Sequence, residues 1–256
     1  MRVLAVGDIV GRAGLEKLKE VLPKVVKENN IDFVIVNGEN AADGMGITEK
    51  MYKEMLDLKV DVVTMGNHTW GKKEIFNFID DKHIIRPANY PSNNPGRGFD
   101  IYECKNKTIA VMNLIGRTTM TVLSENPFLT AKEIIDEIKE AVDIIIIDFH
   151  AEATAEKIAL GYYLDGEATI VFGTHTHVQT ADETILEKGT AYITDIGMTG
   201  PKKSVIGMDV DVSLKRFATS LPEKYRIAEG KAKFNSCMFE IDDVTNKVKK
   251  IERINR

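Results

Sequence analysis

Short apolar runs and helical periodicities alternate along the first third of the chain. Runs of β-branched and apolar residues, typical of buried strands, occupy 2–7, 33–36, 62–63 and 84–86. Leucine and valine recur at helical spacing from Leu15 to Val26, with Lys and Glu between them. Further helices are predicted from Thr48, an N-cap residue type, and over 72–79. Repeated β-α units with short loops predict a parallel sheet with right-handed crossovers.

The rest of the chain adds two hairpin patterns to this α/β arrangement. Turn residues fill 87–98, and strands over about 98–104 and 108–114 with Asn106 between them predict the first hairpin. The pattern then predicts a loop over 117–127, helices over 130–141, 154–164 and 210–217, strands over 143–149, 168–172 and 190–194, and a loop over 195–203. A second hairpin is predicted over 234–241 and 247–254. Because no internal repeat or linker stands out, we predict a single domain over residues 1–256.

Composition limits the class of protein. The 256 residues are 43% hydrophobic and 29% charged, which allows a normal packed core. The net charge of −5 argues against a protein that holds nucleic acid mainly by charge, although a local metal would still attract a small anion. Cys104 and Cys237 lie far apart and indicate neither a disulfide framework nor a zinc ribbon. The N-terminus does not resemble a signal peptide, and no apolar run approaches 18 residues. We therefore expect a cytoplasmic protein that does not enter a membrane.

Residue types that ligate metals follow five predicted strands. They are Asp8; Glu39 and Asn40; Asn67 and His68; His150; and His175 and His177. The carboxyl ends of parallel strands share one edge, so these side chains are expected to converge there. Gly66 is expected to let the chain turn sharply before Asn67. His175 and His177 alternate with Thr176, so an extended backbone would place both imidazoles on one side. Only His83, among the five histidines, lies outside the set.

The chemistry of this set indicates two metal ions. Carboxylate, amide and imidazole donors suit manganese, iron or zinc, and the set lacks the thiolates of a structural zinc site. Eight donors are too many for one such ion, and two neighbouring ions normally share a carboxylate, for which Glu39 is the candidate. Two cations activate a water as hydroxide and clamp the oxygens of a phosphoryl group, while a histidine protonates the leaving oxygen. The pattern thus favours metal-dependent hydrolysis at a phosphoryl group.

Each member of the set also has an ordinary explanation. Asp8 alone could cap a helix, Glu39 to Asn40 and Asn67 could be turn residues, and His150 could be a buried histidine with satisfied hydrogen bonds. The joint occurrence, and the closely spaced pair His175 and His177, favour the metal cluster.

Other motifs give weaker alternatives. Gly7, Gly11 and Gly14 loosely match a dinucleotide fingerprint, but the Gly-x-Gly core is missing, and no Walker A motif follows. Surface charge explains Arg12, Arg86 and Arg117 better than substrate binding does. Asp148 is interpreted as structural, or as a partner of a ligand.

With these motifs the chain resembles the calcineurin-like metallophosphoesterase superfamily. The residues that carry the resemblance are Gly7-Asp8, Gly66-Asn67-His68, the lone His150 and Gly173-x-His175-x-His177. More narrowly it resembles the bacterial YmdB family of phosphodiesterases, through the blocks GDIVGRAG, NGENAADGMGI, GNHTW, DFHAEATAEK and GTHTHVQTAD. The chain departs from the wider superfamily at Asp8-Ile9-Val10, where a histidine is missing, and at Glu39-Asn40, which replaces the usual aspartate block. Both departures are features of the narrower family.

The resemblance implies a four-layer αββα fold with a dinuclear site, often of iron or manganese. It implies that Asp8, Glu39, Asn40 and His177 hold one ion and that Glu39, Asn67, His150 and His175 hold the other. His68 would stay unligated as the proton donor. The implied activity is hydrolysis of 2′,3′-cyclic nucleotides and related phosphodiesters. RNA remains open as a substrate, without stable nucleic-acid binding, and a homo-oligomer also remains open.

Two other functions fit the same metal-liganding pattern. The ions could act as a Lewis acid on amides or carboxyl esters. Alternatively, the chain could be a metal-dependent regulator with a weak or absent hydrolytic role, in which the metal stabilises a binding surface.

Overall fold

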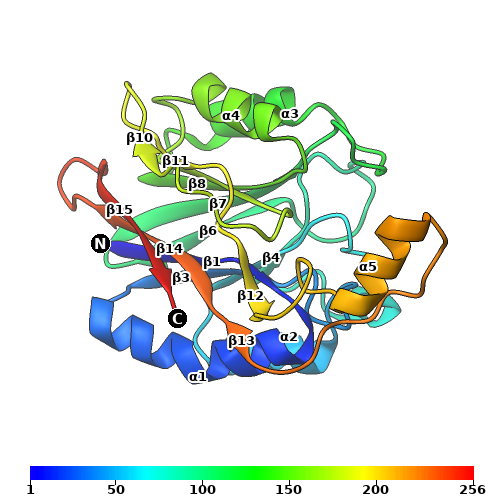
Figure 1. Cartoon of the computed structure of the whole chain (residues 1–256). Helices are drawn as coiled ribbons and strands as arrows, with labels where there is room; N and C mark the ends of the chain where they lie inside the picture. Colours follow the sequence, from blue (N-terminus) through cyan, green and yellow to red (C-terminus); the bar gives the residue numbers. More distant parts are fainter.

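The computed structural model, which describes residues 1–256, stacks two six-stranded sheets face to face (Figure 1). The strand order of the first sheet is β15 (Val248–Asn255), β14 (Asn235–Ile241), β1 (Arg2–Val6), β3 (Phe33–Asn37), β4 (Val62–Thr64) and β5 (Ile84–Ile85). β1, β3, β4 and β5 run parallel, whereas β14 and β15 form an antiparallel hairpin beside β1. The predicted β-α units and the C-terminal hairpin are therefore confirmed.

The second sheet combines a parallel centre with antiparallel edges. Its strand order is β10 (Thr184–Ile185), β11 (Ala191–Ile193), β9 (Ile170–Thr174), β8 (Ile144–His150), β7 (Lys107–Ile115) and β6 (Phe99–Cys104). β11, β9, β8 and β7 are parallel, and β6 pairs antiparallel with β7. The turn between β6 and β7 places Lys105 and Asn106 at positive φ, as expected for a tight hairpin. The first predicted hairpin is confirmed.

Three apolar cores separate four layers. The central core fills the space between the sheets, with Val3 and Phe33 from the first sheet and Ile146 and Phe172 from the second. α1 (Gly11–Asn29) and α2 (Glu49–Asp57) cover the outer face of the first sheet, while α3 (Pro127–Ile138) and α4 (Thr154–Tyr163) cover the second (Figure 1). In strands that are covered on both faces, side chains on both sides are buried. Such strands therefore appear in the sequence as continuous apolar runs. The predicted αββα fold is confirmed.

The helix boundaries follow from capping. Thr48 Oγ1 accepts a hydrogen bond from Met51 N at 3.2 Å and caps α2, as predicted. α3 begins at Pro127 rather than at residue 130, because Asn126 caps it and proline suits the first helical position. The segment predicted as a helix over 72–79 forms only a short 3-10 helix, η1 (Lys73–Asn77). The helix predicted over 210–217 is confirmed as α5 (Val210–Thr219). None of the helices is both long and apolar enough to cross a bilayer.

One expected loop contains a strand. Residues 195–203 include β12 (Met198–Pro201), which pairs in parallel with β2 (Asp8–Ile9) and antiparallel with β13 (Ala232–Lys233). The prediction of a loop was wrong because glycine and proline give this segment a weak local strand signal, whereas its pairing partners are distant in sequence. Since Met198 lies opposite Asp8, the pairing fixes the backbone that carries the Asp8 carboxylate.

Candidate metal centre

Both sheets contribute side chains to one cluster at the carboxyl ends of their parallel strands. In the first sheet, Glu39 and Asn40 follow β3, and Asn67 and His68 follow β4. Asp8 lies in β2, directly after β1. In the second sheet, His150 ends β8, and His175 and His177 follow β9. Direct contacts link all eight residues. The floor of the cluster is buried, and its rim is partly open to solvent.

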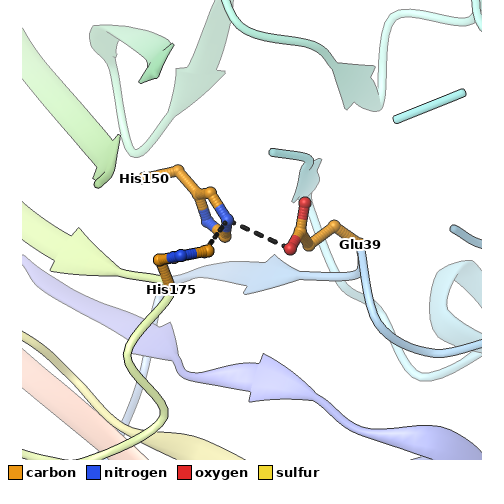
Figure 2. A group of neighbouring side chains, drawn as sticks. All are labelled: Glu39, His150 and His175. Carbon is orange, nitrogen blue, oxygen red and sulfur yellow. Dashed lines mark hydrogen bonds and ion pairs between the residues drawn. The ribbon is translucent and has the colours of Figure 1, made fainter. Parts of the chain in front are cut away.

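His150 lies at the centre of the first half of the cluster (Figure 2). Its Nε2 atom lies 3.0 Å from Glu39 Oε1, 3.0 Å from Asn67 Oδ1 and 3.0 Å from His175 Nδ1. A ring nitrogen carries at most one hydrogen, so a single proton cannot serve three acceptors. Glu39, His150 and His175 each offer a ligand atom within 4.8 Å of the others. A bound metal ion, unlike a proton, accepts lone pairs from several of these ligand atoms at once.

Two of the histidine rings are held by hydrogen bonds on their outer sides. The outer nitrogen of His150 bonds to Thr174 Oγ1 (2.9 Å) and that of His177 to Ile206 O (2.7 Å), whereas the outer nitrogen of His175 lies 3.2 Å from Glu152 Oε2. A backbone carbonyl only accepts, so the outer nitrogen of His177 is a donor. In the neutral ring, the inner nitrogen of His177 therefore directs its lone pair into the cluster. This is the usual arrangement of a histidine that ligates a metal.

Asn40 lies at the centre of the second half of the cluster. Its Nδ2 atom lies 3.0 Å from Glu39 Oε1, 3.2 Å from His177 Nε2 and 3.4 Å from Asp8 Oδ1. Glu39 Oε1 thus contacts both halves of the cluster, through His150 and through Asn40. The amide nitrogen of Asn40, rather than its oxygen, points at these three atoms. Ligation by Asn40 therefore requires its carboxamide to turn over.

His68 differs from the other imidazoles of the cluster. Its side chain is 30% exposed, and its Nδ1 lies 3.0 Å from Asn40 Oδ1 and 3.3 Å from Glu39 Oε1. Its backbone N–H donates to Glu39 Oε2 at 2.8 Å. The ring is thus oriented through Nδ1, while Nε2 makes no hydrogen bond within the protein. This leaves Nε2 available to a substrate.

Buried charges dominate the electrostatics of the cluster. Burial disfavours a charged His150, but the Glu39 carboxylate outweighs it and raises the pKa of His150 to about 9. Burial also works against ionisation of Glu39, yet His150 and His68 hold the pKa of Glu39 well below its usual range. Burial and the charge of His150 lower the pKa of His175 to about 3. The Glu39 carboxylate thus favours a protonated His150 in the metal-free cluster, and metal binding typically displaces such a proton.

A family model described as YmdB-like protein matches residues 4–254. The chain belongs to the YmdB-like protein family. The resemblance that the sequence motifs indicated is therefore confirmed, and it extends over almost the whole chain.

Members of this family and more distant structures share the fold. The chain is 52% identical over 255 residues to a Bacillus subtilis (strain 168) protein named 2′,3′-cyclic-nucleotide 2′-phosphodiesterase, covering 99% of this chain and 96% of that protein. A crystal structure described as a novel phosphatase from Mycoplasma pneumoniae is 38% identical, with a TM-score of 0.95 over 100% of this chain and 93% of that chain. A 5′-nucleotidase precursor from Thermus thermophilus matches at 11% identity, with a TM-score of 0.61 over 100% of this chain and 54% of that chain, which shows the fold alone.

The backbone of this YmdB-like chain departs from expectation at two places in the cluster. The segment after β9 is not extended, because His175 and His177 adopt φ values of 96° and 63°. The expectation of an extended backbone was wrong, and a turn directs the two imidazoles toward different halves. Gly66 is needed for a close approach: an added Cβ would collide with the carboxylate of Glu39 and the ring of His150.

Asp148 was interpreted as structural or as a partner of a ligand, and its contacts agree with that interpretation, whereas Arg86 was misread. Asp148 accepts hydrogen bonds from Thr174 Oγ1 (2.6 Å) and Asn37 Nδ2 (3.2 Å), and burial raises its pKa to about 6. It therefore supports His150 through Thr174. Arg86 is buried and donates to three backbone carbonyls, so its interpretation as surface charge was wrong.

The structure also reveals a buried ion pair beside the cluster, formed by Lys157 and Asp195. Asp195 follows a strand, as the predicted ligands do, so the same rule could have found it. Nothing in the local sequence singles out Lys157.

Proposed function

We propose that this chain is a dinuclear-metal phosphodiesterase that hydrolyses 2′,3′-cyclic nucleotides and related phosphodiesters. The observation that carries the proposal is the convergence of Glu39 Oε1, Asn67 Oδ1 and His175 Nδ1 on His150 Nε2, each at 3.0 Å. The name of the Bacillus subtilis relative supports the substrate class.

The donor set fits two ions. Asp8, Glu39, Asn40 and His177 are the proposed ligands of one, and Glu39, Asn67, His150 and His175 those of the other. Hard carboxylate and amide oxygens mixed with imidazole, and no thiolate, suit iron or manganese. When bound, two such cations lower the pKa of water and neutralise the oxygens of a phosphoryl group.

Groups of the protein itself orient the ligands and protonate the leaving group. Among the proposed ligands, His150 and His177 are held by outer hydrogen bonds to Thr174 and Ile206, so their rings are oriented before an ion binds. His68 donates a proton from Nε2 to the leaving oxygen. Its Nδ1 lies 3.3 Å from Glu39 Oε1, and this contact orients the ring so that Nε2 is free to reach the substrate.

The test is a substrate panel on protein of known metal content. Protein stripped by a chelator is reloaded with Mn²⁺ or Fe²⁺ and assayed on 2′,3′-cyclic AMP, 3′,5′-cyclic AMP, bis-p-nitrophenyl phosphate and p-nitrophenyl acetate. We expect hydrolysis of 2′,3′-cyclic AMP that requires metal. Fully loaded protein that turns over no phosphodiester would refute the proposal, and activity on the acetate ester alone would favour a carboxyl-ester hydrolase.

A further inference from the structure

An ion pair lies buried beneath the segment that carries His175 and His177. Lys157 of α4 and Asp195, which follows β11, are 1% and 0% exposed, and Lys157 Nζ lies 2.7 Å from Asp195 Oδ2. Removing two charges from water carries a large desolvation cost, which a single contact rarely offsets. A buried pair of this kind needs further hydrogen bonds to both partners.

Most of those further hydrogen bonds come from the histidine segment. Lys157 Nζ donates to Thr174 O at 2.7 Å. Asp195 Oδ2 accepts from Thr176 N at 3.1 Å and from Thr176 Oγ1 at 2.7 Å, and its other oxygen accepts from Gly197 N at 2.8 Å. The pair therefore holds the residue before His175 and the residue between the two histidines.

The held segment has an unusual backbone. His175 and His177 both adopt positive φ, which side-chain-bearing residues rarely do. Such conformations persist only where the surroundings determine them, and they concentrate at functional sites. In this turn His175 Nδ1 reaches His150 and His177 Nε2 reaches Asp8, so one segment serves both halves of the cluster.

We propose that Lys157 and Asp195 are positioning residues that hold His175 and His177 in place for the two metal ions at once. The inference rests on the proposed function only for the identity of these ligands. Neither residue contacts the substrate. They act by fixing the turn at Thr174 and Thr176, so that both imidazoles are placed before any ion binds.

The main variant is Asp195→Asn, which keeps the shape and removes the charge. Mn²⁺ affinity is measured by competition with a chromophoric chelator, and amide hydrogen exchange is measured on metal-free protein. We expect Mn²⁺ to bind at least about tenfold more weakly, as when partners of metal ligands are altered. In the metal-free protein, exchange within 174–178 should accelerate by a similar factor while the central strands stay protected.

Asp165→Asn is the matched control. Asp165 is also buried and accepts backbone N–H bonds, from Lys188 and Thr190, but it does not contact the histidine segment. This variant should lose stability without a change in Mn²⁺ affinity or in exchange over 174–178. If both aspartate variants weaken Mn²⁺ equally, or if Asp195→Asn changes neither measurement, the proposal is wrong.

If Asp195→Asn does not fold, a milder pair of variants tests the same proposal. Thr176→Val removes the hydroxyl bond to Asp195, whereas Thr176→Ser keeps it. Only the valine variant should accelerate exchange over 174–178 and weaken Mn²⁺ binding; equal behaviour of the two would overturn the proposal. Wild-type protein that binds Mn²⁺ but hydrolyses no phosphodiester would contradict the proposed function and leave this inference intact.

Discussion

At the scale of single residues, the four imidazoles of the cluster have different surroundings. His150 is fully buried among acceptors, the outer nitrogen of His175 lies near Glu152, and that of His177 bonds to Ile206 O. His68 instead keeps one ring nitrogen free of hydrogen bonds and is partly exposed. An imidazole that is oriented but not enclosed is suited to exchange a proton with a substrate.

Replacing His68 by Ala should therefore separate catalysis from metal binding. The backbone bond from His68 N to Glu39 survives the change, so metal content should remain near that of the wild type. Turnover should fall about 10²- to 10⁴-fold, the usual contribution of a general acid. Metal analysis and kcat on 2′,3′-cyclic AMP check both parts.

His83→Ala is the matched control for this prediction. His83 lies outside the cluster and bonds through Nδ1 to Asp61 O at 2.7 Å. Its removal should leave kcat and metal content close to wild type. If His68→Ala loses metal along with activity, His68 is a ligand and the assigned role is wrong.

At the scale of elements, the loops that follow the strands approach one another closely. The loop after β4 lies so near Glu39 and His150 that Gly66 leaves no room for a side chain. β2 and β12 pair directly beside the cluster and hold Asp8. The element ends are thus packed as tightly as a core, and small changes in volume there should disturb the ligands.

Gly66→Ala should weaken metal binding and reduce stability. Overpacking of a tight site typically costs about 1–3 kcal/mol, and here the displaced groups are the carboxylate of Glu39 and the ring of His150. Urea unfolding and Mn²⁺ competition measure the two effects.

Gly161→Ala provides the comparison for overpacking outside the cluster. A Cβ at Gly161 in α4 meets the ring of Tyr192, which lies in the outer core of the second sheet. This variant should lose stability yet bind Mn²⁺ normally. Wild-type Mn²⁺ affinity in Gly66→Ala would show that the close approach has no role in metal binding.

At the scale of the whole molecule, the cluster joins the two sheets. Glu39 follows β3 of the first sheet and His150 ends β8 of the second, and the two side chains are in contact at 3.0 Å. An ion bound by both would hold the sheets together at this edge. That all of residues 1–256 form one domain stays a prediction from the sequence.

Removal of metal should therefore lower thermal stability. A ligand that binds only the folded state at 100 times its dissociation constant adds about 2.7 kcal/mol. For a chain of this size that corresponds to a drop in Tm of roughly 5–10 °C when a chelator removes the metal. Calorimetry on loaded and stripped protein measures the shift. The Glu39→Gln variant lacks the carboxylate that contacts both halves of the cluster and should show little shift. A wild-type Tm that the chelator does not change would contradict the prediction.

The sequence by itself determined the layers and the members of the cluster. Strands buried on both faces must be apolar throughout, so β3 and β8 are visible as runs, and the polar residues that end them stand out. Parallel strands share an edge, which predicted that Asp8, Glu39 and His150 would meet. These features follow from local periodicity and a simple rule of topology.

Only the tertiary structure decided how the cluster is held. The pairing of β12 with Asp8, the turn at His175 and His177, and the ion pair of Lys157 with Asp195 depend on segments that are distant in sequence. Buried charged residues such as Lys157 and Asp195 do not follow the hydrophobic periodicity of the sequence. They are stabilised by partners that become neighbours only in the folded chain. The candidate ligands could therefore be identified from the sequence, whereas the packing of the two sheets determined how their side chains are oriented.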